Sequence, residues 1–289
     1  MNGPSDKYSQ KSRIAVRVRN MNMILLVLVL VLITITTTVL VTDVTGSASK
    51  NLARFYSIES VDKFDAYISQ DLALVRKVAH SKAVTGWFAD EENEEKRIEA
   101  YNEMMDYASL LQSAELYFGI EESRNEFSIG SGATLEDFVP GDKLTASDPI
   151  NAWYFECIAS ENDYVLNIDI DKFSNRWRLW INHKVTVDGK IVGVFCSGLR
   201  INTVLRNMFA QYNANNVKGY VIDRNGAIQM DSTNYNLHSE GVERRIRDAY
   251  SDPVFTAAID SYLENIHGFF SGDLEPKIMK LSAGSYGYV

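Results

Sequence analysis

An uncharged, strongly apolar stretch at residues 21–42 constrains this chain more than any other feature of its sequence. A helix of about 20 apolar residues can cross a bilayer, and in lipid a single segment satisfies its own backbone only as a helix. Several Lys and Arg side chains and one Asp precede the stretch, and cationic flanks stay in the cytoplasm. We therefore predict a cytoplasmic tail at residues 1–20, a transmembrane helix at 21–42 and an exterior location for the residues that follow.

The alternative to a retained anchor is a cleaved signal peptide. Gly46, Ser47 and Ala48 are small residues that would suit a signal peptidase. The apolar core of a signal peptide runs about 7–15 residues, however, and the stretch in this chain is longer. Its length favours a retained anchor.

The charge of the chain argues against one class of partner. The formal net charge is −9, and the basic N-terminal tail contributes about +4, so the exterior part carries about −13. Nucleic-acid binding needs clustered Lys and Arg, which an acidic exterior part does not supply. The balance is typical of a soluble domain beside an anionic membrane, with no nucleic-acid partner.

The sequence holds two cysteines, Cys157 and Cys196, both in apolar contexts. Two cysteines in a chain of this length do not make a disulfide scaffold. We expect two buried free thiols, and one disulfide between them is the alternative.

Beyond the span, apolar residues recur at spacings of three and four, which is the pattern of one buried helix face. They are Val61, Phe64, Ile68, Leu72, Val75 and Ala79. The pattern predicts a stalk helix from near Lys50 to Phe88, capped at its start by Ser47–Ser49. The charged run Ala89–Arg97 interrupts it and a second amphipathic helix follows over Ile98–Leu111, so residues 45–112 form the stalk and second helix.

The periodicity then changes to two, which is typical of β-strands. A first strand is predicted over Ala114–Ile120, followed by a loop rich in Gly, Pro and Asp over Gly130–Pro149 and by a short aromatic helix. Three further strands are predicted at residues 163–171, 175–185 and 190–199. Asp188-Gly189 is a strong hairpin signal between the last two. We predict an α+β fold in which helices pack on an antiparallel meander, with residues 113–213 as one module.

A second module of the same kind is predicted over residues 214–289. After a linking helix at Ile201–Phe209, the segment Gly219–Ser232 predicts a hairpin turned at Asn225-Gly226. Two helices, at residues 242–250 and 254–266, and a strand pair at 277–289 complete the pattern. The strand at Tyr286–Val289 has no partner strand after it, so we predict that this second module is truncated.

An anchor, a stalk helix and two helix-and-meander modules in series resemble the double Cache sensor, the extracytoplasmic tandem PAS-like domain of bacterial receptors. The resemblance covers residues 45–289. It rests on Trp153-Tyr154 at a helix start and on GKIVGVFCSGL (189–199) at the end of the first module. In the second module it rests on GYVIDRNGAIQMDS (219–232) and GSYGYV (284–289).

The resemblance implies a function in signalling. In such sensors the membrane-distal module, here residues 113–213, binds a small ligand, and residues 214–289 would be the membrane-proximal module. A second transmembrane helix would lead to a chemotaxis signalling rod, a histidine kinase or a diguanylate cyclase beyond residue 289. Receptors of this kind pair as homodimers along the stalk and lie in the bacterial inner membrane.

The sequence carries no catalytic signature. It has no Gly-x-Ser-x-Gly, no P-loop and no dinucleotide-binding motif, and its four His show no metal-binding spacing. We therefore expect a ligand-sensing part of a receptor, without an enzyme activity of its own, a metal or a cofactor. A membrane-anchored extracytoplasmic enzyme and an adhesion module are the alternatives.

The amino-acid-binding branch of the family looks like a Tyr, four residues, an Arg, one residue and a Trp, followed by a Tyr-x-Asp and a later Asp. Trp153 matches the Trp, and Asp169 matches the Asp of Tyr-x-Asp, with Asn167 at the Tyr position. The first Tyr and the last Asp are missing. Asn151 stands where the Arg would grip a carboxylate bidentately, which Asn cannot do. The comparison therefore implies a ligand with an amine or a neutral polar group.

The candidate site residues lie at the start of the aromatic helix and on the polar faces of two strands. They are Asn151, Trp153, Tyr154, Asn167, Asp169, Arg178 and Trp180. Trp153 and Tyr154 either fill a core or line a pocket, and the strand face with Asp169 is either solvated or turned toward that pocket. Trp180 on the corresponding face of the next strand favours a covered or ligand-bearing face. We expect Trp153-Tyr154 to face Asp169 across a pocket.

Overall fold

A computed structural model describes residues 4–213, 215–234, 243–266, 276, 278–281 and 287–289, with the backbone alone for residues 4–12. The helices are α1 Pro4–Ala79, α2 Lys82–Phe88, α3 Glu94–Ala108, α4 Ala152–Ala159, α5 Ile201–Phe209 and α6 Pro253–Ile266, with 3-10 turns η1 Pro149–Asn151 and η3 Ile246–Asp248. The strands are β1 Glu115–Ile120, β2 Asn125–Gly130, β3 Asp142–Lys143, β4 Tyr164–Asp171, β5 Arg176–Val187, β6 Lys190–Arg200, β7 Tyr220–Ile222 and β8 Ile228–Asp231. The predicted α+β class with an N-terminal apolar helix and antiparallel sheets is confirmed.

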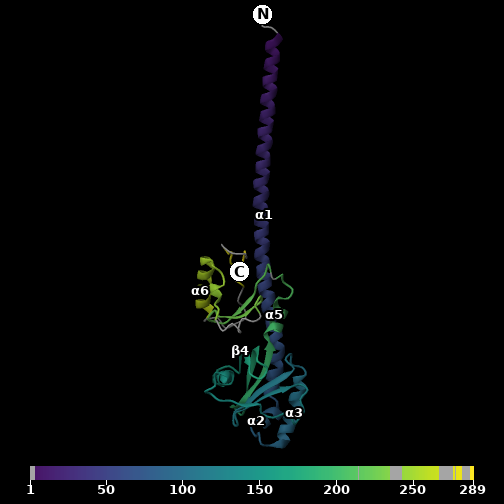
Figure 1. The fold of residues 1–289 in the computed structure, drawn as a ribbon, viewed down its shortest axis with the longest axis vertical. Helices are drawn as coiled ribbons and strands as arrows, with labels where there is room; N and C mark the ends of the chain where they lie inside the picture. Colours follow the sequence, from purple (N-terminus) through teal and green to yellow (C-terminus); the bar gives the residue numbers. More distant parts are fainter. Residues whose placement is uncertain (1–3, 214, 235–242, 267–275, 277, 282–286) are drawn as a thin grey trace.

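Helix α1 is a rod that runs from the N-terminal tail to the far end of the molecule (Figure 1). Within the described residues, its stretch Arg13–Ala79 contains the one segment long and apolar enough to cross a membrane. Four threonines of this segment donate their hydroxyls to carbonyls one turn back, as Thr34 does to Leu30 at 2.8 Å, and such bonds satisfy a hydroxyl without water. The span and the stalk are one continuous helix. The predicted helix start at Ser47–Ser49 is therefore wrong, because no amides are left free there to cap.

The stalk ends earlier than predicted. Helix α1 stops at Ala79, and Ser81 caps α2 by accepting a hydrogen bond from the Val84 amide. The new helix turns Trp87 and Phe88 into the core, where both are buried. The predicted uninterrupted helix to Phe88 is wrong because this cap lets the chain change direction.

Six antiparallel strands form one sheet in the order β3-β2-β1-β6-β5-β4. The predicted hairpin at Asp188-Gly189 joins β5 to β6, with φ of 49° and 78° at the two residues, as a tight hairpin turn requires. The meander β4-β5-β6 is confirmed, but β2 and β3 were not predicted. The turn before β2 places Arg124 at φ 59°. Gly or Asn usually occupies this left-handed position and so reveals a turn in the sequence, whereas Arg does not. Strand β3 lies inside the predicted loop Gly130–Pro149.

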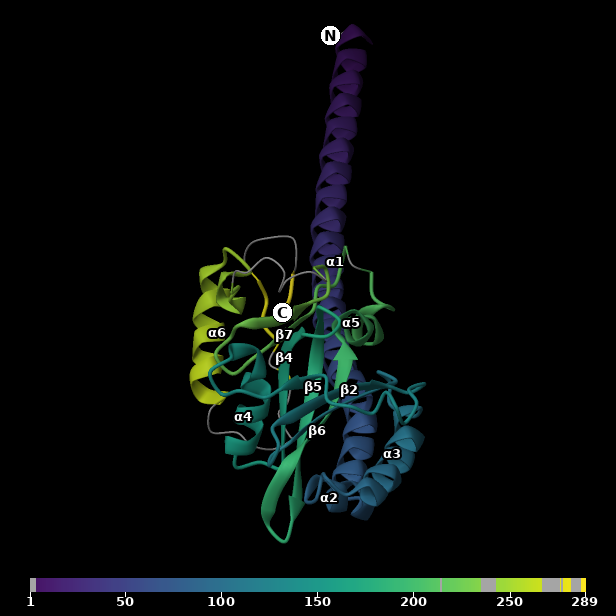
Figure 2. The ribbon, with the colours of Figure 1, turned by 60° about the horizontal axis from the view of Figure 1, so that its bottom comes forward.

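Different helices cover the two faces of the sheet (Figure 2). Helices α1, α2 and α3 pack on one face, where Trp87 lies edge-on to Phe118 at 5.9 Å between ring centroids. Helix α4 packs on the other face and buries Tyr154 there. Alternation along β6 sends Phe195 to the first face and its neighbour Cys196 to the second. The predicted site residues therefore belong to the α4 face.

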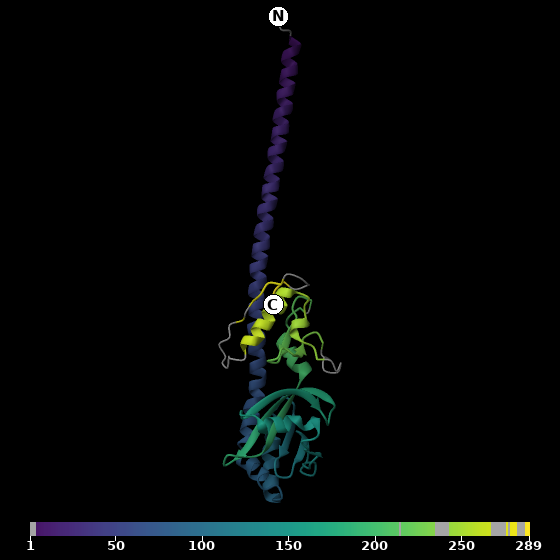
Figure 3. The same ribbon diagram turned by 90° about the vertical axis from the view of Figure 1, so that its left-hand side faces the viewer.

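A smaller unit lies along α1, between the six-stranded sheet and the N-terminal part of the helix (Figure 3). Strands β7 and β8 form its hairpin, turned at Asn225-Gly226 with Gly226 at φ 80°. Phe255 of α6 and Ile246 are buried against Ile228. The helix predicted at residues 242–250 is only the turn η3, because the chain departs from helical geometry after three residues; residue 242 lies outside the described residues.

The last described residues pair with one another. The Met279 amide donates to the Val289 carbonyl at 2.7 Å, and the Val289 amide donates back to Met279 at 3.0 Å. Tyr286, where the last strand was predicted to begin, lies outside the described residues. The predicted domain boundaries and the truncation of the second module stay predictions.

Candidate ligand-binding site

A cavity lies beside α4 on the face of the sheet that this helix covers. Its lining includes Tyr117, Glu126, Trp153, Asp169, Lys172 and Trp180. Its open volume is about 20 Å³, close to the space of one water molecule. The cavity is closed in this state and has to open before a small molecule enters.

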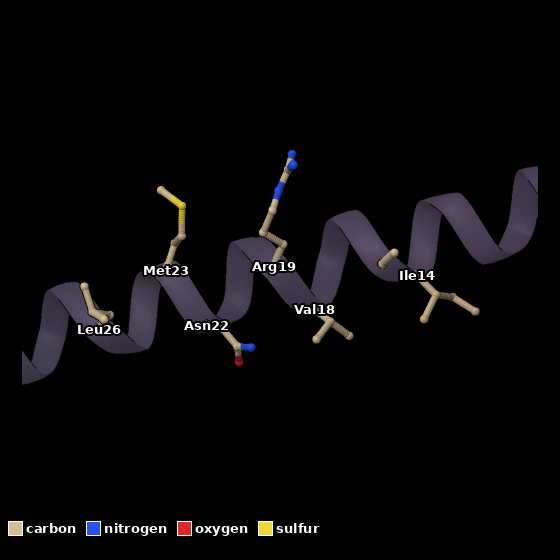
Figure 4. Close-up of a pocket in the computed structure, with 7 residues that line it drawn as sticks. Ile14, Val18, Arg19, Asn22, Met23 and Leu26 are labelled. Carbon is tan, nitrogen blue, oxygen red and sulfur yellow. The ribbon is translucent and has the colours of Figure 1, made fainter.

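A second hollow, on α1, is not comparable (Figure 4). Its side chains, among them Ile14, Val18 and Met23, project from successive turns of a single helix, and no other described element lies opposite them. The surface belongs to the N-terminal part of the apolar helix, where lipid and its headgroups are the expected neighbours. It is the open surface of one helix and not a ligand cavity.

The structure brings three of the predicted site residues to the cavity: Trp153, Asp169 and Trp180. Trp180 lies edge-on to Tyr117, with 4.7 Å between ring centroids. Its indole N–H donates to the backbone carbonyl of Asp169 at 3.3 Å. The aromatic wall is therefore fixed to the sheet, next to the strand that carries the carboxylate.

Asp169 is a half-buried carboxylate without a cationic partner among the described residues. Its Oδ1 accepts a hydrogen bond of 2.7 Å from the Ile170 amide. Burial raises the pKa of Asp169, and this hydrogen bond lowers it in part. Arg178 lies opposite Asp169 in the ladder, but its guanidinium points elsewhere. Asp169 is thus the acidic group in the cavity wall that is free to meet a ligand.

Arg178 does not line the cavity. It is 1% exposed and pairs with Asp171 at 3.0 Å and with Glu115 at 2.6 Å. A third donor reaches the carbonyl of Gly198 at 2.9 Å. The guanidinium lies over the Tyr117 ring at 5.4 Å, so it supports the aromatic wall, and its charge is already paired with two carboxylates.

Three further predicted site residues make internal hydrogen bonds. Tyr154 is fully buried, and its hydroxyl donates to Glu121 at 2.6 Å. Asn167 accepts from Asn182 at 2.7 Å. Asn151 is buried, and its Oδ1 accepts from Lys172 at 3.0 Å. Of the aromatic pair, Trp153 is wall and Tyr154 is core, so both alternatives left open by the sequence occur one residue apart.

No protein-family model matches the chain, but several solved structures of bacterial sensory domains are similar to it in fold. The ligand-binding domain of the Campylobacter jejuni chemoreceptor Tlp3 in complex with 4-methylisoleucine is similar with a TM-score of 0.54 and 15% identity, over 84% of this chain and 83% of that one. The sensory domain of the same chemoreceptor gives 0.51 and 16%, over 84% and 86%. The ligand-binding domain of the Pseudomonas fluorescens chemoreceptor CtaA in complex with L-serine gives 0.50 and 15%, over 71% and 78%.

This chain has the fold of a chemoreceptor sensory domain. The predicted resemblance to the double Cache sensors is thereby confirmed at the level of the fold. At this identity the likeness carries the arrangement of helices and sheets but no ligand and no residue role. The function of this sensory fold has to be argued from its own cavity.

Sequence reasoning missed three charged residues in the cavity of this sensory fold: Glu126, Lys172 and Asp171, which is paired with Arg178. Glu126 lies in β2, the strand that was not predicted, and Lys172 follows directly after β4. A signal was available for Glu126: in NEFSIG it alternates with the apolar Phe127 and Ile129, so it faces away from the core that they enter. No local pattern marks Lys172, because its partners come from distant segments.

Both cysteines of the sensory fold are free and buried, as predicted. Burial raises the pKa of the Cys157 thiol to about 12, so it stays protonated at neutral pH. Cys196 lines the cavity and contributes apolar surface to it. A buried, neutral thiol is a small apolar group rather than a nucleophile.

One buried carboxylate connects the cavity wall of the sensory fold to the stalk. Asp71 of α1 is fully buried and accepts a 2.6 Å hydrogen bond from Ser197 of β6. It also accepts from the amide of Gln112 at 3.2 Å. Ser197 follows Cys196 along β6, so the cavity wall and the hydrogen bond to α1 are one residue apart.

Replacing Asp71 by Asn is expected to remove part of the pH dependence of unfolding. Burial raises the pKa of Asp71, and the hydrogen bonds from Ser197 and Gln112 lower it less. A raised folded-state pKa makes the fold more stable below the unfolded-state pKa, near 4, and less stable as pH rises through the folded-state value. Asp71→Asn should therefore gain stability relative to wild type as pH rises from about 4 to 7.

Urea unfolding at several pH values measures this difference. Asp62→Asn, a change of an exposed carboxylate on the same helix, is the matched control. A constant offset between Asp71→Asn and wild type at every pH, or the same pH trend in both variants, would contradict the prediction.

Proposed function

We propose that this chain is the extracytoplasmic ligand-sensing part of a bacterial transmembrane signalling receptor of the inner membrane. The apolar segment at residues 21–42 would anchor it, with the basic tail in the cytoplasm, and the six-stranded module would lie far from the bilayer. The continuous helix α1 and the sensory fold support this arrangement. The output, a chemotaxis rod, a histidine kinase or a diguanylate cyclase, would be carried by residues beyond 289.

The ligand proposed for the cavity is a small molecule with a cationic amine or a neutral polar group. The observation that carries this is the Asp169 carboxylate, which has no cationic partner among the described residues and lines the cavity together with Trp153 and Trp180. An amine gains a charge-assisted hydrogen bond there, and aromatic walls attract cations. A ligand α-carboxylate has no arginine available to bind it bidentately, because Asn151 stands at the position of the family's Arg and Arg178 is paired with Asp171 and Glu115.

Signalling would proceed by a shift between a closed and an open cavity. The closed state has no room for a ligand, so a ligand binds the open state alone. Its full binding free energy therefore shifts the equilibrium toward the open state. Opening moves the wall formed by β6, and the Ser197–Asp71 hydrogen bond passes that motion to α1. A rigid helix of this length carries a small displacement to the membrane.

The receptor is further proposed to act as a homodimer that pairs along α1. Leu52, Phe55 and Ile58 are exposed apolar residues on the stalk outside the span. Contiguous exposed apolar residues on a soluble part of a chain mark an interaction site. A second copy of the helix would cover them.

A thermal-shift screen of the full chain in detergent tests the proposed function. We expect amines and neutral polar compounds to raise the unfolding midpoint, since a ligand at a hundredfold excess over Kd stabilises by about 2.7 kcal/mol. Dicarboxylates of similar size serve as controls. A screen in which only carboxylates stabilise the chain would overturn the assigned ligand class, and one without any stabilising compound would overturn the sensing function.

A further inference from the structure

Lys172 carries an ammonium group that three side chains surround, and one of them, Glu126, also lines the cavity. Its Nζ lies 2.9 Å from Asp142 Oδ2 and 3.0 Å from Asn151 Oδ1, and it forms an ion pair with Glu126. An ammonium has three N–H donors and no acceptor, so three acceptors satisfy it completely. We call Glu126, Asp142 and Asn151 the ammonium cage.

The cage is assembled across the sheet rather than along one element. Glu126 belongs to β2, Asp142 to β3 and Asn151 to η1, whereas Lys172 follows β4 at the opposite edge of the sheet. Lys172 therefore ties the two edges together over the face that α4 covers. Phe173 packs so closely on Gly141 that a Cβ there would lie 2.9 Å from the ring, which holds the turn in place.

The cage needs a cation. Glu126 is 4% exposed, and Lys172 is the only partner of its Oε2 among the described residues. Burial raises the pKa of Glu126, and the hydrogen bond from Lys172 lowers it in part. Burial lowers the pKa of Lys172, but its hydrogen bonds to Glu126 and Asp142 outweigh this, so that pKa is raised. The buried carboxylate of Glu126 and the oxygens of Asp142 and Asn151 thus surround one positive charge, which Lys172 supplies.

Lys172 also contributes to the closure of the cavity, because it lines a space of only about 20 Å³. Most other lining groups come from strands or from the start of α4, where backbone hydrogen bonds hold them. Lys172 lies on a turn, and its flexible four-carbon stem can rotate outward. That rotation would vacate a space with the shape of an aliphatic ammonium, ending at three acceptors.

We propose that the ammonium cage is a second cation subsite beside Asp169, that the chain fills it with its own Lys172, and that an aliphatic primary amine enters the cavity by displacing Lys172. The inference rests on the proposed function of this cavity as a ligand site. It narrows the ligand to amines that offer three N–H donors, because methylated ammonium groups cannot satisfy the cage.

Displacement has a consequence for affinity and for the turn. Lys172 is a tethered competitor of the amine. The apparent affinity for the amine equals the intrinsic affinity multiplied by the fraction of molecules in which the cage is free. Removing Lys172 should therefore increase the affinity for an amine. In the wild-type chain, an amine in the cage would release residues 172–175 from β2 and β3.

The probe is butylammonium chloride, added to the full chain in detergent. We expect it to raise the unfolding midpoint of Lys172→Ala by about 3–6 °C at a tenfold excess over Kd, and that of wild type by less. Potassium chloride at equal ionic strength and butyltrimethylammonium, which has the charge but no N–H, should give no such rise. Lys184→Ala is the matched control, because it removes a partly buried ammonium that donates to Ser160 outside the cage.

Two double variants locate the bound probe. Glu126→Gln in the Lys172→Ala background should abolish the rise, and Asp169→Asn in that background should keep it. An equal rise in Lys184→Ala, or one that survives Glu126→Gln, would overturn the second subsite. The two proposals fail separately. If butylammonium does not raise the unfolding midpoint of Lys172→Ala, the cage is refuted and Asp169 stays a candidate. If it does raise that midpoint but no compound in the screen stabilises the wild-type chain, the sensing function is refuted and the cage stands.

Hydrogen exchange in the wild-type chain tests displacement without any substitution. Saturating butylammonium should make the amides of residues 172–175 exchange faster, on the order of tenfold, because the turn loses its tie to β2 and β3. Ordinary ligand binding protects nearby amides instead. Unchanged or slower exchange in this turn would show that an amine binds without displacing Lys172, and the displacement would be refuted even if Lys172→Ala does not fold.

Discussion

Arg178→Met is expected to destabilise the six-stranded module by about 3–5 kcal/mol, because it leaves buried carboxylates without their cation. Asp171 is almost completely buried, and Arg178 Nε lies 3.0 Å from its Oδ2. Methionine is long and unbranched, so it replaces much of the apolar stem of Arg178 and leaves little empty space in the core. The loss of stability therefore reports the missing charge.

The same variant should change how stability depends on pH. Burial raises the pKa of Asp171, but hydrogen bonds from Ser174 and Tyr117 and the charge of Arg178 outweigh it, so that pKa is lowered. A lowered folded-state pKa contributes stability above the unfolded-state value, near 4, that is lost as pH falls through the folded-state value. Arg178→Met should lose part of this acid-sensitive contribution.

Urea unfolding of Arg178→Met and of Arg176→Met gives the comparison. Arg176 is an exposed residue two positions earlier on β5, so its replacement should change stability by less than about 0.5 kcal/mol. Adding Asp171→Asn to Arg178→Met should recover part of the loss. Equal midpoints for the two arginine variants would show that the buried network contributes no net stability.

Asp169→Asn is expected to weaken the binding of a cationic ligand by roughly ten- to a hundredfold, since a hydrogen bond to a charged group contributes about 1.5–3 kcal/mol. Folding should barely change, because Asn keeps an oxygen in place to accept from the Ile170 amide. Asn is also similar in size, so the aromatic wall of Trp153 and Trp180 should keep its packing.

Calorimetric titration with the compound found in the screen measures this effect. Asp163→Asn removes one negative charge from an exposed position just before β4 and controls for the overall charge of the module. A similar loss of affinity in both variants would assign the effect to long-range attraction, and equal affinities of wild type and Asp169→Asn would remove Asp169 from the site.

Features that depend on neighbouring residues were determined by the sequence alone. The apolar span was visible because a bilayer imposes a length and a composition on one continuous segment. The turns at Asp188-Gly189 and Asn225-Gly226 were visible because tight hairpins need residues that tolerate positive φ. Alternation along β4 and β5 showed which side chains share a face, and Asp169 and Trp180 do line one cavity.

Features that depend on partners far apart in the chain were decided by the tertiary structure. Alternation placed Arg178 on the site face, but only the packed sheet brings Glu115, 63 residues away, to its guanidinium. Strand β2 escaped prediction because Arg124 takes the left-handed position that Gly or Asn usually marks. Lys172 meets Glu126 only because the two edges of the sheet are joined across the α4 face. Local sequence sets the face a side chain points to, whereas charge pairing and cavity volume depend on which distant groups arrive there.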